Sequence, residues 1–212
     1  FERREWFESH FPADFIVEYI GQAKAWFYTL HVLSTALFDK PPFRTVVAHG
    51  ILLGDDGRKL SKKLKNFPDP DQALANYGAD AMRWYLLSSP VLRGADIAVD
   101  AKGFAESVRA VLLPLWNAFS FFTMYANVDR IAGERRANAT GVLDRYALAK
   151  TRELVETVTA RMDSYDIAGA ASAIGSYLDA LTNWYIRRSR ERFWSPLADA
   201  ESDKADAYDT LY

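Results

Sequence analysis

The sequence predicts a mostly helical protein with a small parallel β part, followed by an α-helical bundle. Residues 14–53 read as strand, helix and strand with short links, which is typical of a βαβ unit. Beyond them the apolar residues recur at helical spacing through three long stretches, residues 104–126, 142–164 and 168–193. This change of period places a domain boundary near residue 100.

The β part rests on three local patterns. "DFIVEYI" (14–20) is a short apolar strand, and "FRTVVAHGILL" (43–53) is a second strand rich in β-branched residues. Between them, residues 22–40 have helical periodicity and stop at Pro41-Pro42. We therefore expect parallel strands joined by a right-handed crossover.

Such sheets bind ligands at the carboxyl ends of their strands. Residues 18–22 lie at the first of these ends, and a glycine-bounded basic loop follows shortly after the second. We expect the two segments to face one crevice.

The next segment, residues 67–89, predicts a short helix, a break at Gly78 and a second helix. Asp69 is the expected N-cap, with Pro70 at the first helical position. Residues 90–103 have loop and extended character. At the C-terminus "SPLADAESDKADAYDTLY" is polar and acidic, and we expect its first part to be weakly ordered and "DAYDTLY" to be helical.

Composition excludes several classes of protein. The 212 residues are 50% hydrophobic with a net charge of −2, so any nucleic-acid contact must come from a local basic patch. There is no cysteine, and the three histidines show no metal-ligand spacing. No apolar run is long enough to span a membrane, and we expect a cytoplasmic protein. The chain begins with Phe1 rather than methionine, which indicates a piece of a longer polypeptide.

The basic loop, "GDDGRKLSKKLKN" (54–66), is the main functional signal. Acidic residues flank its run of five cations. The cations are Arg58, Lys59, Lys62, Lys63 and Lys65. Such a loop is either a solvated surface feature or a phosphate-binding one, because preorganised ammonium groups stabilise the charge of phosphoryl chemistry. It does not match the Walker pattern.

The amino-acid sequence of the loop favours a phosphate-binding role. "KLSKK" resembles the KMSKS signature of class I aminoacyl-tRNA synthetases, and the upstream "HG" and downstream "YGADAMRWYLL" are written as in that family. "FPADFIVEYIGQAKAWFYTLH" and "NFPDP" resemble the isoleucyl branch, and "LLPLWNAFSFF" and "LTNWYIRRSRERFW" resemble its anticodon-binding helices. The resemblance covers nearly the whole chain.

The resemblance implies a fold and an activity. Residues 1–100 would be the C-terminal half of a Rossmann-type catalytic core, and residues 101–212 an incomplete anticodon-binding domain. Isoleucyl enzymes activate isoleucine with ATP and Mg²⁺ and transfer it to tRNA(Ile); no metal site and no membrane contact are expected in this chain. The first histidine motif of the family and its editing domain are missing, so we expect the chain to be inactive alone and the full-length protein to be a monomer.

The resemblance also assigns roles to individual residues. Glu18 would accept hydrogen bonds from the adenylate, at its ribose, and Gln22 would hold the amino-acid carboxylate or the adenylate linkage. Trp26 would form a wall of the side-chain pocket. His49 and Gly50 would border the adenylate. The catalytic group would be Lys62 on the ATP phosphates, assisted by Lys59 and Ser61.

The chain departs from the family at the end of the first strand. Gly-x-Asp-Gln is usual there, whereas this chain has Tyr19, Ile20, Gly21 and Gln22, so an aspartate contact is missing. Ala25 also stands where the family has glycine.

In the helical half, "NWYIRRSRERFW" (183–194) combines arginines with aromatics, which suits binding to RNA loops. The resemblance implies tRNA contact by some of Arg187, Arg188, Arg190 and Arg192, and the residues alone fit a solvated helix face equally well. We expect five residues of the preceding helix to be bundle core: Trp116, Asn117, Phe119, Phe121 and Phe122.

Two other readings stay open. One is a non-catalytic RNA-binding module derived from a synthetase, and the other is the valyl or leucyl enzyme.

Overall fold

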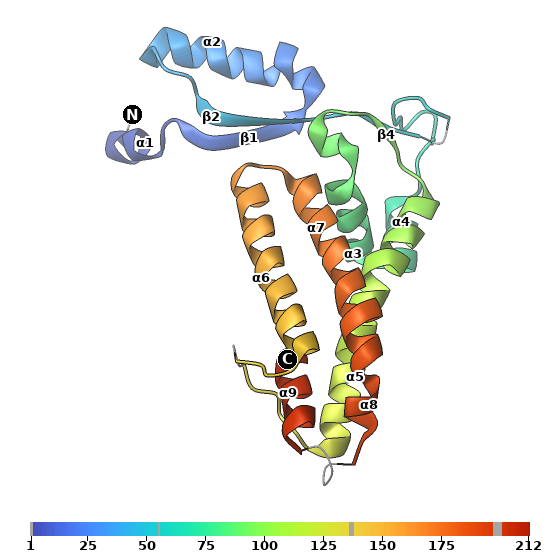
Figure 1. Cartoon of the computed structure of the whole chain (residues 1–212). Coiled ribbons are helices and arrows are strands. Elements are labelled where there is room, and N and C mark those ends of the chain that lie inside the picture. Colours follow the sequence, from blue (N-terminus) through green and yellow to red (C-terminus); the bar gives the residue numbers. More distant parts are fainter. Residues whose placement is uncertain (1, 55, 136–137, 197–200) are drawn as a thin grey trace.

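The computed structural model describes residues 2–54, 56–135, 138–196 and 201–212. A small β part lies across one end of a set of long helices that run away from it (Figure 1). The predicted class, mostly helical with a small parallel β part, agrees with this arrangement.

The β part contains a short helix α1 (Arg4–His10), strand β1 (Ala13–Tyr19), helix α2 (Trp26–Phe38) and strand β2 (Phe43–His49). β1 and β2 pair in parallel, as predicted, with Tyr19 opposite His49. The carboxyl ends of the two strands therefore lie side by side.

The helix predicted over residues 22–40 is shorter than expected. A 3₁₀ helix η1 (Ile20–Lys24) leaves β1, and α2 begins only at Trp26, because Ala25 has φ −133° and ψ −101°, outside the helical region. α2 ends at Phe38, and Asp39 after it takes a left-handed conformation two residues before the predicted proline stop.

The strand predicted over residues 43–53 is divided in two. β2 ends at His49, and β3 (Leu52–Leu53) joins a second parallel pair with β4 (Ile97–Ala98). The division falls at Gly50, whose N–H donates to the Val91 carbonyl at 2.8 Å. A Cβ at this position would overlap the Ala95 backbone, so the chain can pass here only as glycine.

Helix α3 (Pro70–Ser88) follows the basic loop and confirms its predicted start and break. The Asp69 carboxylate accepts hydrogen bonds from the N–H groups of Asp71 and Gln72. Gly78 is non-helical, with φ 80°, and divides the helix into two parts. A 3₁₀ turn η2 (Pro90–Arg93) then leads to β4.

The helical half consists of long helices that are interrupted by π-helical turns. α4 (Ala101–Ser107), the π turn η3 (Val108–Leu112) and α5 (Leu113–Asp129) form one continuous rod. α6 (Val142–Asp163) runs back, and α7 (Ile167–Asp179), the π turn η4 (Ala180–Ile186) and α8 (Arg187–Trp194) form the third rod. The three predicted helical stretches correspond to these rods.

The short helix α9 (Glu201–Leu211) confirms the predicted C-terminal helix. The weakly ordered part that the sequence predicts falls mostly on residues 197–200, outside the described residues. Ala207 and Tyr208 of α9 are fully buried against Phe193. Buried Lys204 pairs with Asp129 at 2.6 Å, so α9 is tied to the end of α5.

The expectation for the aromatic residues of α5 is partly wrong. Phe121 and Phe122 pack against the buried clusters around Tyr185 and Phe193, as predicted. Trp116 and Phe119 are instead 64% and 57% exposed, and Asn117 is exposed as well. The buried stripe of α5 passes through Ala118, which leaves its neighbours on the outer face.

Candidate functional site

The predicted site begins at the carboxyl ends of β1 and β2. Glu18 lies opposite Ala48 on the neighbouring strand, one position before the Tyr19–His49 pair. Its carboxylate accepts the Tyr19 N–H at 3.2 Å, and His49 Nδ1 lies 2.8 Å from the Gly50 carbonyl oxygen. Glu18, His49 and Gly50 are thus brought to one edge of the sheet.

The η1 turn brings Gln22 and Trp26 to the same edge. The Gln22 side-chain oxygen accepts the Trp26 N–H at 3.0 Å and so caps the start of α2. The Gln22 NH₂ group has no partner among the described residues. Trp26 is 46% exposed, so its ring is a surface wall rather than core.

The basic loop is a hairpin-like structure pinned to β3. The Gly54 N–H donates to the Arg58 carbonyl at 2.8 Å, the Leu60 N–H donates to the Leu52 carbonyl at 3.3 Å, and Leu53 forms an antiparallel bridge with Lys59. Gly57 at the tip has φ 72°, which favours glycine. Backbone hydrogen bonds and the Leu53–Lys59 bridge therefore hold the loop against β3.

Asn66 organises the inside of this loop. Its Oδ1 accepts the Ser61 N–H at 2.9 Å, and its Nδ2 donates to Asp56 at 2.9 Å and to the carbonyls of Arg58 and Lys59 at 3.3 Å each. One side chain thus holds the backbone at Arg58, Lys59 and Ser61, where the lysine motif begins. The hydrogen bond from Asn66, followed by those from Arg58, lowers the pKa of Asp56 to about 2.

The cationic side chains of the loop stay on its surface. Lys62 is exposed and has no ion pair among the described residues, and the Ser61 hydroxyl has no hydrogen bond there. Lys59 extends over the Tyr19 ring, with Nζ 4.8 Å from the ring centroid. This contact brings the lysine loop to the carboxyl end of β1, as the sequence predicts.

The predicted RNA-binding arginines lie at the other end of the molecule, on α8 (Figure 1). Arg187 and Arg190 are exposed, and the Arg188 guanidinium stacks over the Trp184 ring at 4.2 Å. Trp184 and Arg188, four positions apart, thus lie on one face of the helix.

Arg192 is different from its three neighbours. Its side chain is only 15% exposed and forms a bidentate pair with the fully buried Asp144, at 2.7 and 2.8 Å. Asp203 provides a second carboxylate at 2.9 Å. Arg192 is therefore bonded within the protein rather than presented to a ligand.

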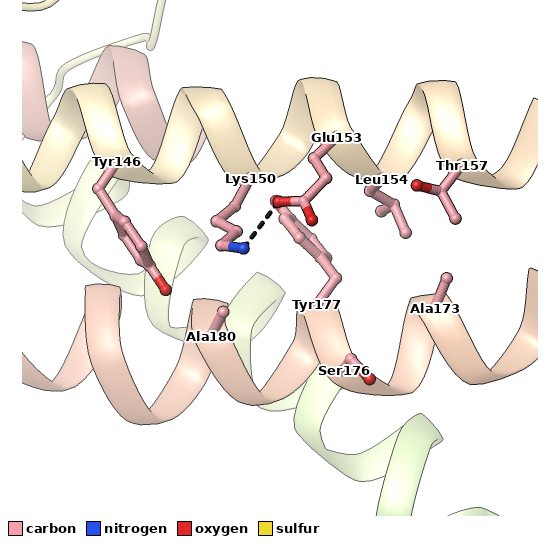
Figure 2. A pocket seen from close by; sticks show the side chains of 9 residues that line it. All are labelled: Tyr146, Lys150, Glu153, Leu154, Thr157, Ala173, Ser176, Tyr177 and Ala180. Atoms are coloured by element: carbon pink, nitrogen blue, oxygen red, sulfur yellow. Dashed lines mark hydrogen bonds and ion pairs between the residues drawn. The ribbon is translucent and has the colours of Figure 1, made fainter.

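A separate hollow of about 310 Å³ lies between α6 and α7. Figure 2 shows that Tyr146, Lys150 and Glu153 face it from α6, and Tyr177 from α7; Lys150 pairs with Glu153 at 2.7 Å. None of the predicted site residues lines it.

No metal site is found within the described ranges, because these contain no cluster of three or more His, Asp or Glu side chains that could hold an ion. Likewise, none of the described helices has the length and apolar character needed to cross a bilayer.

Comparison with known protein families shows which family this chain matches. The family described as "tRNA synthetases class I (I, L, M and V)" matches residues 1–100, and the family described as "Anticodon-binding domain of tRNA ligase" matches residues 144–212. The chain belongs to the class I tRNA synthetases. The lysine loop lies within the residues that the synthetase family matches.

Individual relatives agree with this membership. Isoleucine–tRNA ligase of Leifsonia xyli is 56% identical over all 212 residues, which are 19% of that relative's length. This synthetase chain thus spans about a fifth of the curated relatives it matches. Methionyl-tRNA synthetase of Mycobacterium tuberculosis, in complex with methionyl-adenylate, shares the fold with a TM-score of 0.75 at 24% identity, over 98% of this chain and 40% of the other. The LeuRS ternary complex of Agrobacterium radiobacter K84 has a TM-score of 0.70 at 21% identity, over 94% of this chain and 24% of the other.

Sequence reasoning missed three contributors to the site. Asn66 and Asp56 shape the loop, and the Tyr19 ring receives Lys59. Asn66 stands in a turn-like "KNFPDP" stretch, where asparagine is too common to signal a special role.

Proposed function

We propose that the protein to which this chain corresponds activates isoleucine with ATP and transfers it to tRNA(Ile). The observation that carries the proposal is the exposed lysine loop docked at the carboxyl end of β1, in a chain that is 56% identical over its whole length to an isoleucine–tRNA ligase. The same sheet edge holds Glu18, Gln22 and Trp26, which suits them to bind the aminoacyl-adenylate.

The binding residues have chemistry that fits these roles. Glu18 accepts hydrogen bonds from the ribose, and the NH₂ group of Gln22 meets the carboxyl oxygen of the amino acid. The exposed ring of Trp26 supplies the apolar wall for the isoleucine side chain. His49 and Gly50 border the adenylate at the end of β2.

The loop residues act on the phosphates. ATP enters with Mg²⁺, and negative charge builds up as the carboxylate attacks the α-phosphate and pyrophosphate leaves. Lys62, an exposed cation on an ordered loop, stabilises this charge, and Lys59 and the Ser61 hydroxyl assist it.

The division of labour follows the two halves of the chain. We assign residues 1–100 to the C-terminal half of a Rossmann-type catalytic domain and residues 101–212 to an anticodon-binding domain. The match of the synthetase family to residues 1–100 supports this boundary. The core cluster of Ala73, Val99 and Phe104 packs across it and couples the halves.

Contact with tRNA is assigned to α8. Arg187, Arg188 and Arg190 present guanidinium groups to solvent, whereas Arg192 stabilises the bundle through Asp144. The full-length protein is proposed to work as a cytoplasmic monomer, and the chain alone is proposed to be inactive.

ATP–pyrophosphate exchange on the full-length protein tests the proposal. Lys62→Ala should lower the exchange rate with isoleucine by about 100-fold, the scale of losing one preorganised charge donor. Lys102→Ala, which removes an exposed lysine outside the loop, is the matched control and should leave the rate unchanged. A Lys62→Ala rate equal to wild type would refute the catalytic role. No exchange by the wild type with any amino acid would favour a non-catalytic RNA-binding module.

A further inference from the structure

The Tyr19 ring folds back over the turn that follows it. An added Cβ on Gly21 would overlap three atoms of this ring, including the hydroxyl oxygen. Gly21 has no left-handed φ, so the reason for glycine at this position is space rather than backbone conformation. The ring can hold its place only because residue 21 has no side chain.

The same ring receives the first lysine of the loop. Lys59 Nζ lies 4.8 Å from the Tyr19 ring centroid. The Lys59 backbone is fixed by its bridge to Leu53 and by the Asn66 side chain on its carbonyl. Among the described residues no carboxylate pairs with Lys59, so the ring is the partner that locates its ammonium group.

Because the Tyr19 ring occupies the space of a side chain at residue 21, the two residues form one steric unit. The aromatic face binds the ammonium of Lys59 without neutralising it, whereas a carboxylate would compete with incoming phosphates.

We infer that Tyr19 is a positioning residue that docks Lys59 and thereby holds the lysine loop over the phosphate site, with Gly21 providing the room. The inference rests on the proposed function. Exposed cation–π contacts contribute about 0.5–1 kcal/mol, which corresponds to roughly 2–5-fold in the docked population. The expected effects are therefore small but measurable.

The kinetic test uses the full-length protein and pyrophosphate exchange with isoleucine. Tyr19→Leu should raise the KM for ATP about 2–5-fold and leave the KM for isoleucine unchanged, and Tyr19→Phe, which keeps the ring, should behave as wild type. Gly21→Ala should match Tyr19→Leu, because it displaces the ring. In the double variant Tyr19→Leu/Lys59→Ala, the leucine substitution should add nothing to the effect of Lys59→Ala.

Three results would overturn the inference. They are full additivity of the Tyr19 and Lys59 substitutions, an equal rise in the KM for isoleucine, and a Tyr19→Phe enzyme as impaired as Tyr19→Leu. The first result would show that the two residues act independently. The second would show that Tyr19 acts on the isoleucine pocket, and the third that its hydroxyl group is needed.

A second readout does not depend on catalysis. Cleavage of the full-length protein by a lysine-specific protease after Lys59, located by mass spectrometry without ATP, reports how often this side chain leaves the ring. Tyr19→Leu should speed this cleavage about 2–5-fold and Tyr19→Phe should not. Unchanged cleavage in Tyr19→Leu would refute the docking even if the wild type shows exchange. Absent wild-type exchange together with faster cleavage would refute the proposed function alone.

Discussion

The buried ion pair between Asp144 and Arg192 allows a sharp test of how the helical half is held together. Asp144 is 0% exposed in the first turn of α6, and it accepts two bonds from Arg192 and one from the Tyr185 hydroxyl at 2.8 Å. Burial alone would lower the pKa of Arg192, but its hydrogen bonds to Asp144 and Asp203 outweigh burial and raise it. Arg192 remains charged when Asp144 is removed, because an arginine guanidinium does not deprotonate in proteins.

Asp144→Ala leaves a weaker partner for the charge of Arg192, whose side chain is only 15% exposed in the wild type. Breaking a buried pair by removing one member typically costs about 3–5 kcal/mol of unfolding free energy. Asp203, at 2.9 Å, still balances part of the charge, and the Tyr185 hydroxyl retains the Ala207 carbonyl at 3.3 Å. We therefore expect the lower end, about 3 kcal/mol.

Urea unfolding of the chain, followed by circular dichroism at equilibrium, measures this difference. The matched control is Asp80→Ala, which breaks an exposed pair with Arg83 whose side chains are 79% and 69% exposed. That pair should contribute less than about 0.5 kcal/mol. The double variant Asp144→Ala/Arg192→Met should recover about 2 kcal/mol relative to Asp144→Ala, because the stranded charge is gone.

A loss below about 1 kcal/mol in Asp144→Ala would contradict this reasoning. So would a double variant that is less stable than Asp144→Ala alone. Either result would mean that the buried pair does not hold α6 against α8.

Two further predictions concern Gly50 and Asp166. Gly50→Ala should destabilise the chain by about 1–3 kcal/mol in the same urea assay, because the new Cβ collides with the Ala95 backbone. The control is Gly57→Ala, whose new Cβ meets no atom although its φ of 72° causes strain. A loss of stability in Gly57→Ala as large as in Gly50→Ala would contradict the steric cause. The hydrogen bond from Arg93, aided by Arg161 against the effect of burial, lowers the pKa of Asp166 to about 2. Since the folded-state pKa is depressed, this stabilisation is complete above the ordinary value of about 3.9 and is lost as the pH falls toward 2. The melting temperature should therefore fall less steeply between pH 4 and 2 in Asp166→Asn than in wild type, and identical slopes would contradict the assignment.

Local signals explain what the sequence could predict of the fold. The Pro41-Pro42 stop, the Asp69 cap and the Gly78 break each act within a few residues of their position, and each was predicted close to where it occurs. The division at Gly50 depends on Val91 and Ala95, some forty positions away, so no local pattern could indicate it.

The candidate site shows the same limit. The sequence of the lysine loop indicated its family, because the residues of the motif are adjacent in the chain. The burial of Arg192 depends on Asp144, 48 positions earlier, and the docking of Lys59 depends on Tyr19, 40 positions earlier. Such pairings arise from tertiary packing, and they changed the interpretation of Arg192 from RNA contact to structural support.

Amino-acid preference in ATP–pyrophosphate exchange by the full-length protein tests the central claim most directly. The account predicts that exchange is strongest with isoleucine and weaker with valine by about 10–200-fold, the range that one methylene allows in an apolar pocket. It also predicts no exchange by residues 1–212 alone. Exchange strongest with valine or leucine would contradict the assignment to the isoleucyl branch.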